Sequence, residues 1–188
     1  MKNILEKIVN DKKQSLELIK KDKSLDVLEK NIKDQDFYNF KKAIQKNKGV
    51  SIISEIKKAS PSAGILIDNF NHLEVAKMYV ENGATCLSVL TEEKYFMGKL
   101  EHIQDIKKKF KIPILAKDFF IDPYQIPLAK SFGSDCILII IAALNGSQAD
   151  EIYSEALKHN LSVIVEVHDT KEAEMALKYD QALIGINN

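Results

Sequence analysis

Arginine is absent from the 188-residue chain, so all 27 basic residues are lysines. The planar guanidinium group, which pairs with carboxylates and phosphates through two parallel hydrogen bonds, is therefore missing. Any anion that this protein binds must be held by lysine ammonium groups or backbone N–H groups. Lys, Ile and Asn are all abundant, as AT-rich coding would produce, so we read no function into the bias.

The chain also lacks an excess of charge of either sign, because 27 acidic residues balance the lysines. A net charge of zero excludes the broad electrostatic attraction that draws proteins to nucleic acid or to an anionic membrane. The longest hydrophobic run, residues 136–144, is too short to cross a bilayer, and the first residues lack the apolar segment of a secretory signal. We therefore expect a cytoplasmic protein with no nucleic-acid or membrane partner.

Cysteine is scarce, with two residues, and neither belongs to a CxxC pair. Cys86 and Cys136 each stand in an apolar, strand-like run, where a buried and reduced thiol is the ordinary role. The four histidines form no recognisable ligand cluster with them. The sequence thus predicts no metal site.

Apolar residues make up 45% of the chain, enough for one sizeable core. Residues 1–48 contain no Gly or Pro and place apolar side chains near helical spacing, which predicts an N-terminal helical extension with a further helix over residues 36–45. A helix that covers a site and a helix that plugs a core have the same pattern, so the pattern alone assigns the extension no mechanism. Residues 49–188 form one domain of a different kind.

From residue 50 onward, short β-rich runs alternate with amphipathic helical segments, which is typical of parallel βαβ architecture. Strands are expected at residues 50–56, 86–90, 112–116, 136–141, 162–167 and 183–186, and helices at 72–82, 100–109, 124–132, 148–159 and 171–179. After the first step, the interval of roughly two dozen residues matches the repeat of a (β/α)8 barrel. A doubly wound sheet has the same alternation, so the location of polar residues must separate the two folds.

Helix boundaries carry their own signals. Ser147 with Asp150, and Asp169 with Glu172, have the spacing of a helix N-cap followed by an acidic residue three positions on. Gly133 follows an expected helix end, where glycine is favoured. These signals support the alternation of strands and helices.

Polar residues close four of the expected strands. Glu55 and Lys57 end the first, Lys117 the third and Glu166 the fifth, while Asn187 follows the sixth. In a (β/α)8 barrel the C-terminal strand ends converge on one mouth, where two lysines and two glutamates would form an acid–base constellation. Taken singly, each charge is as readily a solvated surface group, but Glu166 within an apolar strand needs a partner or a mouth. The pattern favours a barrel enzyme.

A family resemblance follows from the loop after the first strand, where Ser60 and nearby backbone donors could meet a phosphate or carboxylate. Residues 54–62, SEIKKASPS, resemble the signature of indole-3-glycerol-phosphate synthases. Four further blocks match the same family in the same order: 87–96 (LSVLTEEKYF), 116–126 (AKDFFIDPYQI), 165–168 (VEVH) and 184–188 (IGINN). The resemblance covers nearly the whole chain and is least specific over residues 1–48.

The resemblance implies a (β/α)8 TIM-barrel fold and a carboxy-lyase of tryptophan biosynthesis. That family converts 1-(2-carboxyphenylamino)-1-deoxyribulose 5-phosphate to indole-3-glycerol phosphate, with loss of CO2 and water, and needs no metal or organic cofactor. By this resemblance Lys117 is the general acid at the carbonyl, and Glu166 and Glu55 serve the later proton transfers. Lys57 holds the substrate carboxylate or donates in the dehydration, so the division of labour between the two lysines stays open.

The same resemblance implies a set of binding residues. Asn187 would bond the ribulose portion of the substrate and Ser60 would assist at its anionic end. Phe96, Phe119 and Leu138 would line the anthranilate pocket, with core packing as the alternative role. The N-terminal helices would cover the mouth and exclude water.

The family continues beyond the sixth strand with two further strand–helix units, whose loops bind the substrate phosphate. We therefore expect a barrel truncated after its sixth strand, with the acid–base residues but without the phosphate anchor. One alternative is an incompetent fragment or split-barrel half that needs a partner, either the missing C-terminal segment or a fused or partner tryptophan-pathway enzyme. The other is a different phosphate-sugar barrel enzyme, such as phosphoribosylanthranilate isomerase.

Overall fold

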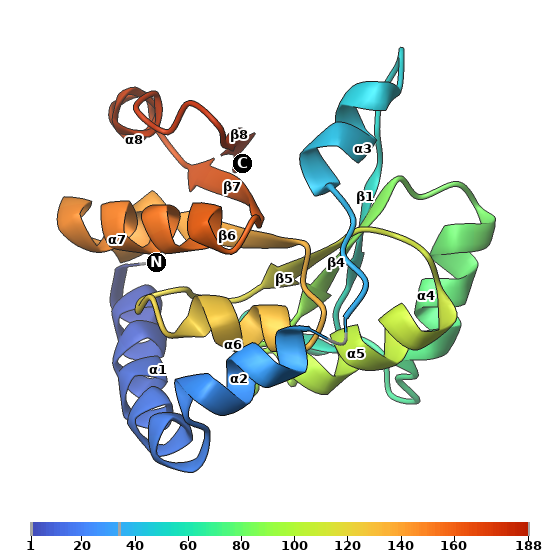
Figure 1. Ribbon diagram of the computed structural model, residues 1–188, viewed down its shortest axis with the longest axis horizontal. Helices are drawn as coiled ribbons and strands as arrows, with labels where there is room; N and C mark the ends of the chain where they lie inside the picture. The colour runs from blue at the N-terminus through green and yellow to red at the C-terminus, as the bar shows by residue number, and fades with distance from the viewer. Residues whose placement is uncertain (1, 34, 188) are drawn as a thin grey trace.

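The computed structural model describes residues 2–33 and 35–187 and consists of a curled parallel sheet surrounded by helices (Figure 1). The sheet contains β1 (Ile53–Ile56), β4 (Cys86–Leu90), β5 (Ile114–Lys117), β6 (Cys136–Ile140), β7 (Ser162–Val167) and β8 (Leu183–Ile186), hydrogen-bonded in that order. A doubly wound sheet would reverse its strand order about a switch point. Strictly sequential neighbours instead give the half-barrel of a TIM-barrel fold.

The connecting helices are α4 (His72–Glu81), α5 (Leu100–Lys109), α6 (Gln125–Ser131), α7 (Gly146–Lys158) and α8 (Thr170–Ala176), with a short 3-10 turn, η1 (Ile141–Ala143), after β6. The predicted alternation is confirmed, and β4, β7, β8 and α5 have their expected bounds. The first strand begins at Ile53, three residues later than predicted, because its pairing with β4 begins where Ile53 lies opposite Cys86, the first residue of β4. None of the helices in the described ranges is long and apolar enough to span a membrane.

One predicted helix cap was wrong, and one short hairpin was not predicted. Helix α7 is capped by Asn145 rather than Ser147: Asn145 Oδ1 accepts a hydrogen bond from the backbone N–H of Gln148 at 3.0 Å, and the Gln148 side chain returns to the Asn145 N–H. The loop after β1 also contains an antiparallel hairpin of β2 (Ala59–Ser60) and β3 (Gly64–Ile65). Both cap residue types favour helix starts, so sequence alone could not choose between positions two residues apart.

Strand alternation divides the core into an outer and an inner layer. The outer layer faces the helices and is fully buried; it includes Leu87 and Val89 on β4, Ile137 and Ile139 on β6, and Val165 on β7. Cys86 and Cys136 face the barrel interior, where both are free thiols. Burial raises the pKa of the Cys86 thiol to about 12, so it stays protonated and unreactive at neutral pH.

The N-terminal helices α1 (Lys2–Asp22), α2 (Leu25–Ile32) and α3 (Phe40–Lys46) occupy different ends of the barrel. Helix α1, blue in Figure 1, contributes Ile8 to a cavity at the C-terminal strand ends. Helix α3, cyan and far from α1 in the same view, inserts Phe40 among Cys86 and Cys136, the first residues of β4 and β6. Helix α1 therefore covers one end of the barrel, and α3 plugs the other. The helical pattern of residues 1–48 did not show which helix has which role.

Candidate active site at the strand ends

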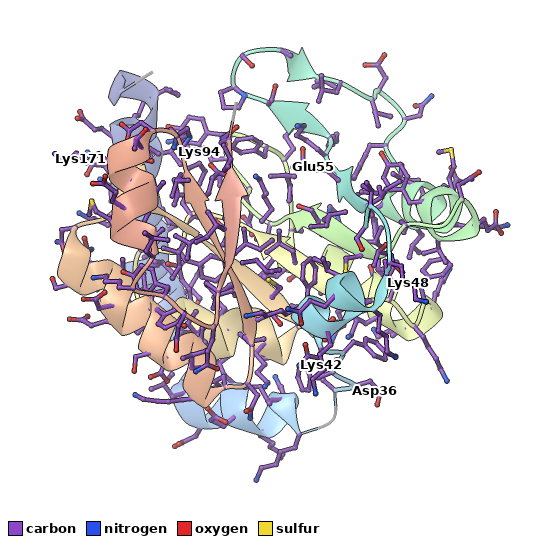
Figure 2. All side chains as sticks on the ribbon, turned by 90° about the horizontal axis from the view of Figure 1, so that it is seen from above. Asp36, Lys42, Lys48, Glu55, Lys94 and Lys171 are labelled. Carbon is purple, nitrogen blue, oxygen red and sulfur yellow. The ribbon has the colours of Figure 1, made fainter. Side chains whose placement is uncertain are left out.

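A cavity of about 670 Å³ lies at the C-terminal ends of the strands, beneath the start of α1. It is lined by eight of the nine predicted site residues: Glu55, Lys57, Phe96, Lys117, Phe119, Leu138, Glu166 and Asn187. Figure 2 labels Glu55 and Lys94 toward this end of the molecule, and Asp36 and Lys42 toward the opposite end. We call these two ends the mouth and the base.

The register of the sheet brings the charged residues to one level. Lys117 on β5 is paired with Leu90 on β4, and Glu166 on β7 is paired with Ile140 on β6. Each of these positions has its side chain in the barrel interior, since alternate residues face the helices. The last inward-facing position of successive strands therefore forms the floor of the cavity, as in barrel enzymes generally.

Two ion pairs stand on this floor. Lys117 Nζ lies 3.3 Å from Glu166 Oε2, and Lys57 Nζ lies 2.5 Å from Glu55 Oε1. The Lys117 side chain is 31% exposed and that of Glu166 is 13% exposed, so the pair is open to the cavity on one side. Asn187 Nδ2 donates to the other oxygen of Glu166, Oε1, at 3.0 Å. The arrangement offers ammonium donors and carboxylate acceptors to a molecule in the cavity.

An aromatic wall lines the same cavity. The ring centroids of Phe96 and Phe119 are 6.3 Å apart, and Leu138 lies in the same lining. The loop that carries Phe96 is held by the buried Glu92, whose carboxylate accepts hydrogen bonds from the backbone N–H groups of residues 94–96 at 2.6 to 3.2 Å. Gly98 closes the loop so tightly that a Cβ atom there would lie 2.2 Å from the Leu90 carbonyl oxygen. The wall is therefore a rigid surface for a flat apolar group.

Ser60 is the predicted site residue that the structure does not place in the cavity lining. Its hydroxyl accepts a hydrogen bond from the Ala63 backbone N–H at 3.2 Å, within the β2–β3 hairpin. The neighbouring Pro61 lines the cavity in its place. The Ser60 hydroxyl keeps its own O–H as a donor in this contact.

Sequence reasoning missed a buried carboxylate that stands next to the floor. Asp118 is 9% exposed and accepts from Thr91 Oγ1 at 2.8 Å, from the Phe119 backbone N–H at 2.7 Å and from Lys12 Nζ at 2.6 Å. Lys12 belongs to α1, so this pair fixes the helix over the mouth. The Lys-Asp dipeptide at positions 117–118 stands out in the sequence, but its partner near the start of the chain carries no local signal.

His168 and Glu172 were also missed as site residues, although both line the cavity. His168 follows β7 directly, and Glu172 lies in the first turn of α8. Within the described residues, no group of three or more His, Cys, Asp or Glu side chains is arranged to hold a metal ion.

Comparisons with known proteins give a consistent result. A family model described as Indole-3-glycerol phosphate synthase matches residues 5–188. Proteins of that name from Legionella pneumophila (strain Lens) and Aliarcobacter butzleri (strain RM4018) are each 43% identical, covering 100% and 98% of this chain and 72% of each relative. The relative from Thermoanaerobacter pseudethanolicus is 42% identical over 98% of this chain and 70% of its own length. The chain thus spans about seven-tenths of the length of these relatives.

Proposed function

Since the chain belongs to the indole-3-glycerol phosphate synthase family, we propose that the cavity at the mouth is where the indole ring is closed. The family is a carboxy-lyase of tryptophan biosynthesis and acts on a phosphorylated small molecule. The observation that carries the proposal is that the contacts Lys117–Glu166–Asn187, the Lys57–Glu55 pair and an aromatic wall all line one cavity. Relatives at 43% identity bear the synthase name, so phosphoribosylanthranilate isomerase is not favoured.

Lys117 is the general acid in this proposal. Ring closure needs a proton, or a strong hydrogen bond, at the ribulose carbonyl oxygen while the aromatic ring attacks the carbonyl carbon. The Lys117 ammonium is held toward the cavity by Glu166 at 3.3 Å, a contact loose enough for the ammonium to reach a substrate oxygen. The carboxyl group on the ring carbon that made this attack then leaves as CO2, which restores the aromatic electron system.

Glu166, Glu55 and Lys57 serve the dehydration that follows. The hydroxyl formed from the carbonyl must leave as water, which requires one proton delivered to that oxygen and one removed from the ring. Lys57 donates the proton to the leaving hydroxyl or first holds the substrate carboxylate, and of the two glutamates one accepts the ring proton while the other stabilises the developing cation. The 2.5 Å contact between Lys57 and Glu55 supports their acting as one donor–acceptor unit.

Phe96, Phe119 and Leu138 contact the anthranilate ring in this proposal, while Asn187 bonds the ribulose hydroxyls. Residues 1–48 act as an extension of the barrel domain, and α1 covers the substrate. Its apolar residues Ile4, Leu5 and Ile8 complete the roof of the cavity, which would exclude water from the reacting intermediate.

We also propose that two further strand–helix units close the sheet between β8 and β1, supplied by further chain or by a partner. In the described part of the chain, β1 and β8 are the sheet's outer strands, and Ile53 and Ile186 on them are 37% and 84% exposed. Open edges of this kind need cover. Adding a segment equivalent to the last two units of a relative should raise turnover and restore phosphate-dependent binding; no change in either would contradict this closure.

The proposed site is tested by Lys117→Met in the chain supplemented with that segment. Loss of a general acid should lower kcat by about 10²- to 10⁴-fold, measured from the fluorescence of the indole product. Lys109→Met, at an exposed lysine at the end of α5, is the matched control and should keep normal turnover. Wild-type kcat in Lys117→Met would overturn the assignment.

A further inference from the structure

A row of polar contacts runs from the start of α8 into the cavity. Glu172 Oε2 accepts hydrogen bonds from the His168 backbone N–H at 2.8 Å and from the ring nitrogen Nδ1 at 3.1 Å. Across the ring, His168 Nε2 lies 3.2 Å from Asn187 Nδ2, which also donates to Glu166 Oε1 at 3.0 Å. The row joins Glu172 and His168, which have no role in the proposed mechanism, to Asn187 and Glu166, which have one.

The local structure explains how Glu172 reaches the imidazole. Only His168 and Asp169 connect β7 to α8, and Asp169 caps the helix by accepting from the Glu172 backbone N–H at 2.8 Å. In a capping box, the acidic residue at the third helical position turns back to the backbone N–H of the cap residue itself. Glu172 instead bonds to the residue before the cap, on both its backbone and its ring. The helix start is therefore arranged around the histidine.

The contacts determine the hydrogen positions. A carboxylate only accepts hydrogen bonds, so Nδ1 of His168 carries the hydrogen in its contact with Glu172. In the neutral ring, Nε2 is then an acceptor, and the neighbouring Asn187 Nδ2 donates to it. Glu166 Oε1 lies 3.6 Å from Nε2, too far for a direct hydrogen bond.

The same contacts orient the Asn187 amide. Both N–H bonds of Nδ2 have acceptors, one on Glu166 and one on His168, so the carbonyl oxygen is the amide atom left for a substrate hydroxyl. A flipped amide would place its oxygen against the Glu166 carboxylate and the His168 lone pair. The flipped form is therefore disfavoured by repulsion between the amide oxygen and two acceptors, as long as Nε2 of His168 has no hydrogen.

We propose that Glu172 and His168 are positioning residues for the ring-closure reaction, which select the orientation of the Asn187 amide through the tautomer of the imidazole. The inference rests on the proposed function, because it takes Asn187 and Glu166 to face the substrate. Its consequence for recognition is a preference for a substrate hydroxyl that donates to Asn187 Oδ1. If His168 loses its Nδ1–H tautomer, the Asn187 amide can flip. The flip should disturb the position of the reacting atoms more than the affinity for the substrate.

The test uses Glu172→Ala and Glu172→Gln in the chain supplemented with the last two strand–helix units of a relative, with Glu174→Ala at an exposed position of α8 as the control. Nitrogen-15 NMR of labelled histidine distinguishes the two tautomers. We expect the Nδ1–H form in the wild type, in Glu174→Ala and in Glu172→Gln, whose amide oxygen still accepts. Glu172→Ala should populate the Nε2–H form and lower kcat by roughly 10- to 100-fold, with a smaller change in KM.

An unchanged tautomer and an unchanged kcat in Glu172→Ala would overturn the inference. If that variant does not fold, His168→Phe tests the same step, because it removes the acceptor at Nε2; wild-type kcat in folded His168→Phe would be equally contrary. The NMR measurement needs no turnover. Retained activity in Lys117→Met would overturn the proposed function without affecting the tautomer result, so the two failures are distinguishable.

Discussion

The mouth and the base of the barrel each contain a lysine–carboxylate ion pair, but the two pairs differ in how far they are buried. At the base, Asp135 stands just before β6 with a side chain that is 0% exposed, paired with Lys107 Nζ at 2.9 Å. Its oxygens also accept from the backbone N–H groups of Tyr38 at 2.6 Å and Ile114 at 2.8 Å. At the mouth, Lys117 and Glu166 are partly exposed and keep hydrogen-bonding capacity toward the cavity.

The two ends differ in whether their charged side chains have hydrogen-bonding groups left for a ligand. Burial raises the pKa of the Asp135 carboxyl and lowers the pKa of the Lys107 ammonium, so each charge is costly there and depends on the other. The Lys107 ammonium also lies 4.0 Å from the centroid of the Tyr38 ring. The base therefore joins the N-terminal extension to β5, β6 and α5, whereas the mouth leaves donors and acceptors free for a ligand.

The largest expected effect on stability is at the base. Asp135→Asn leaves Lys107 buried without its counter-charge, which should lower the free energy of unfolding by about 3–5 kcal/mol. Denaturant unfolding measures the loss, and the fraction that stays folded should turn over normally. Asp68→Asn, at an exposed loop position, is the control. If Asp135→Asn lowers the free energy of unfolding no more than Asp68→Asn does, the ion pair at the base does not stabilise the fold more than an exposed charge.

Lys12→Met should have an intermediate effect, because Lys12 and Asp118 form a pair at the mouth that is nearly as buried as the pair at the base. Asp118 keeps its bonds to Thr91 and Phe119, so we expect a loss of about 1–3 kcal/mol. Loosening of α1 should also raise KM. Lys13→Met, one exposed position along the helix, controls for the loss of charge. Equal unfolding midpoints and equal KM in the two variants would argue against the pair as the anchor of α1.

Lys117→Met should barely change stability despite its large expected effect on turnover. The side chain is 31% exposed, so the ion pair with Glu166 is screened by solvent and its loss should cost about 1 kcal/mol or less. The measurement is the same denaturant titration used for Asp135→Asn. A loss as large as that at the base would mean that the mouth pair is structural.

The smallest effect concerns pH and the outer face of α1. Hydrogen bonds from Lys94 and then Tyr95 lower the pKa of the Asp11 carboxyl below its ordinary 3.8. A lowered pKa in the folded state means that these contacts contribute fully above about pH 3.8 and are lost as the pH falls through the folded value. Carbonyl NMR titration of Asp11 should show this, with Lys94→Met moving its midpoint upward. A midpoint that Lys94→Met leaves unchanged would rule out Lys94 as the cause.

Local patterns predict most of the fold and most of the floor of the site. Residue spacing locates the strands, and each strand's last inward-facing residue follows from alternation, so the sequence alone is enough to place Lys117 and Glu166 at one mouth. Partners far apart in the chain are not predictable in this way. Asp135 bonds to Tyr38, 97 residues away, and nothing near either residue in the sequence marks the other.

His168 illustrates a second limit. It belongs to the block 165–168 that resembles the family, yet the positioning role proposed for it depends on a hydrogen bond to Glu172. That carboxylate bonds to the residue before the helix cap, whereas a capping box would bond to the cap residue itself. The spacing of Asp169 and Glu172 predicts the helix start correctly but gives no sign that the Glu172 side chain points to the imidazole. The direction of a side chain, unlike the position of a helix, is set by tertiary contacts.

The attachment of the N-terminal extension has a consequence for the order of folding. Its residues are made first during synthesis, but their partners come much later: Lys20 bonds to Asp122 across 102 residues, and the Lys41 backbone N–H bonds to the Ser162 hydroxyl across 121. A high share of contacts between residues so distant in the chain is associated with slower folding. During synthesis, these contacts of the N-terminal extension can form only after β5 and β7 have been made, so we expect its docking to come late in the assembly of the chain.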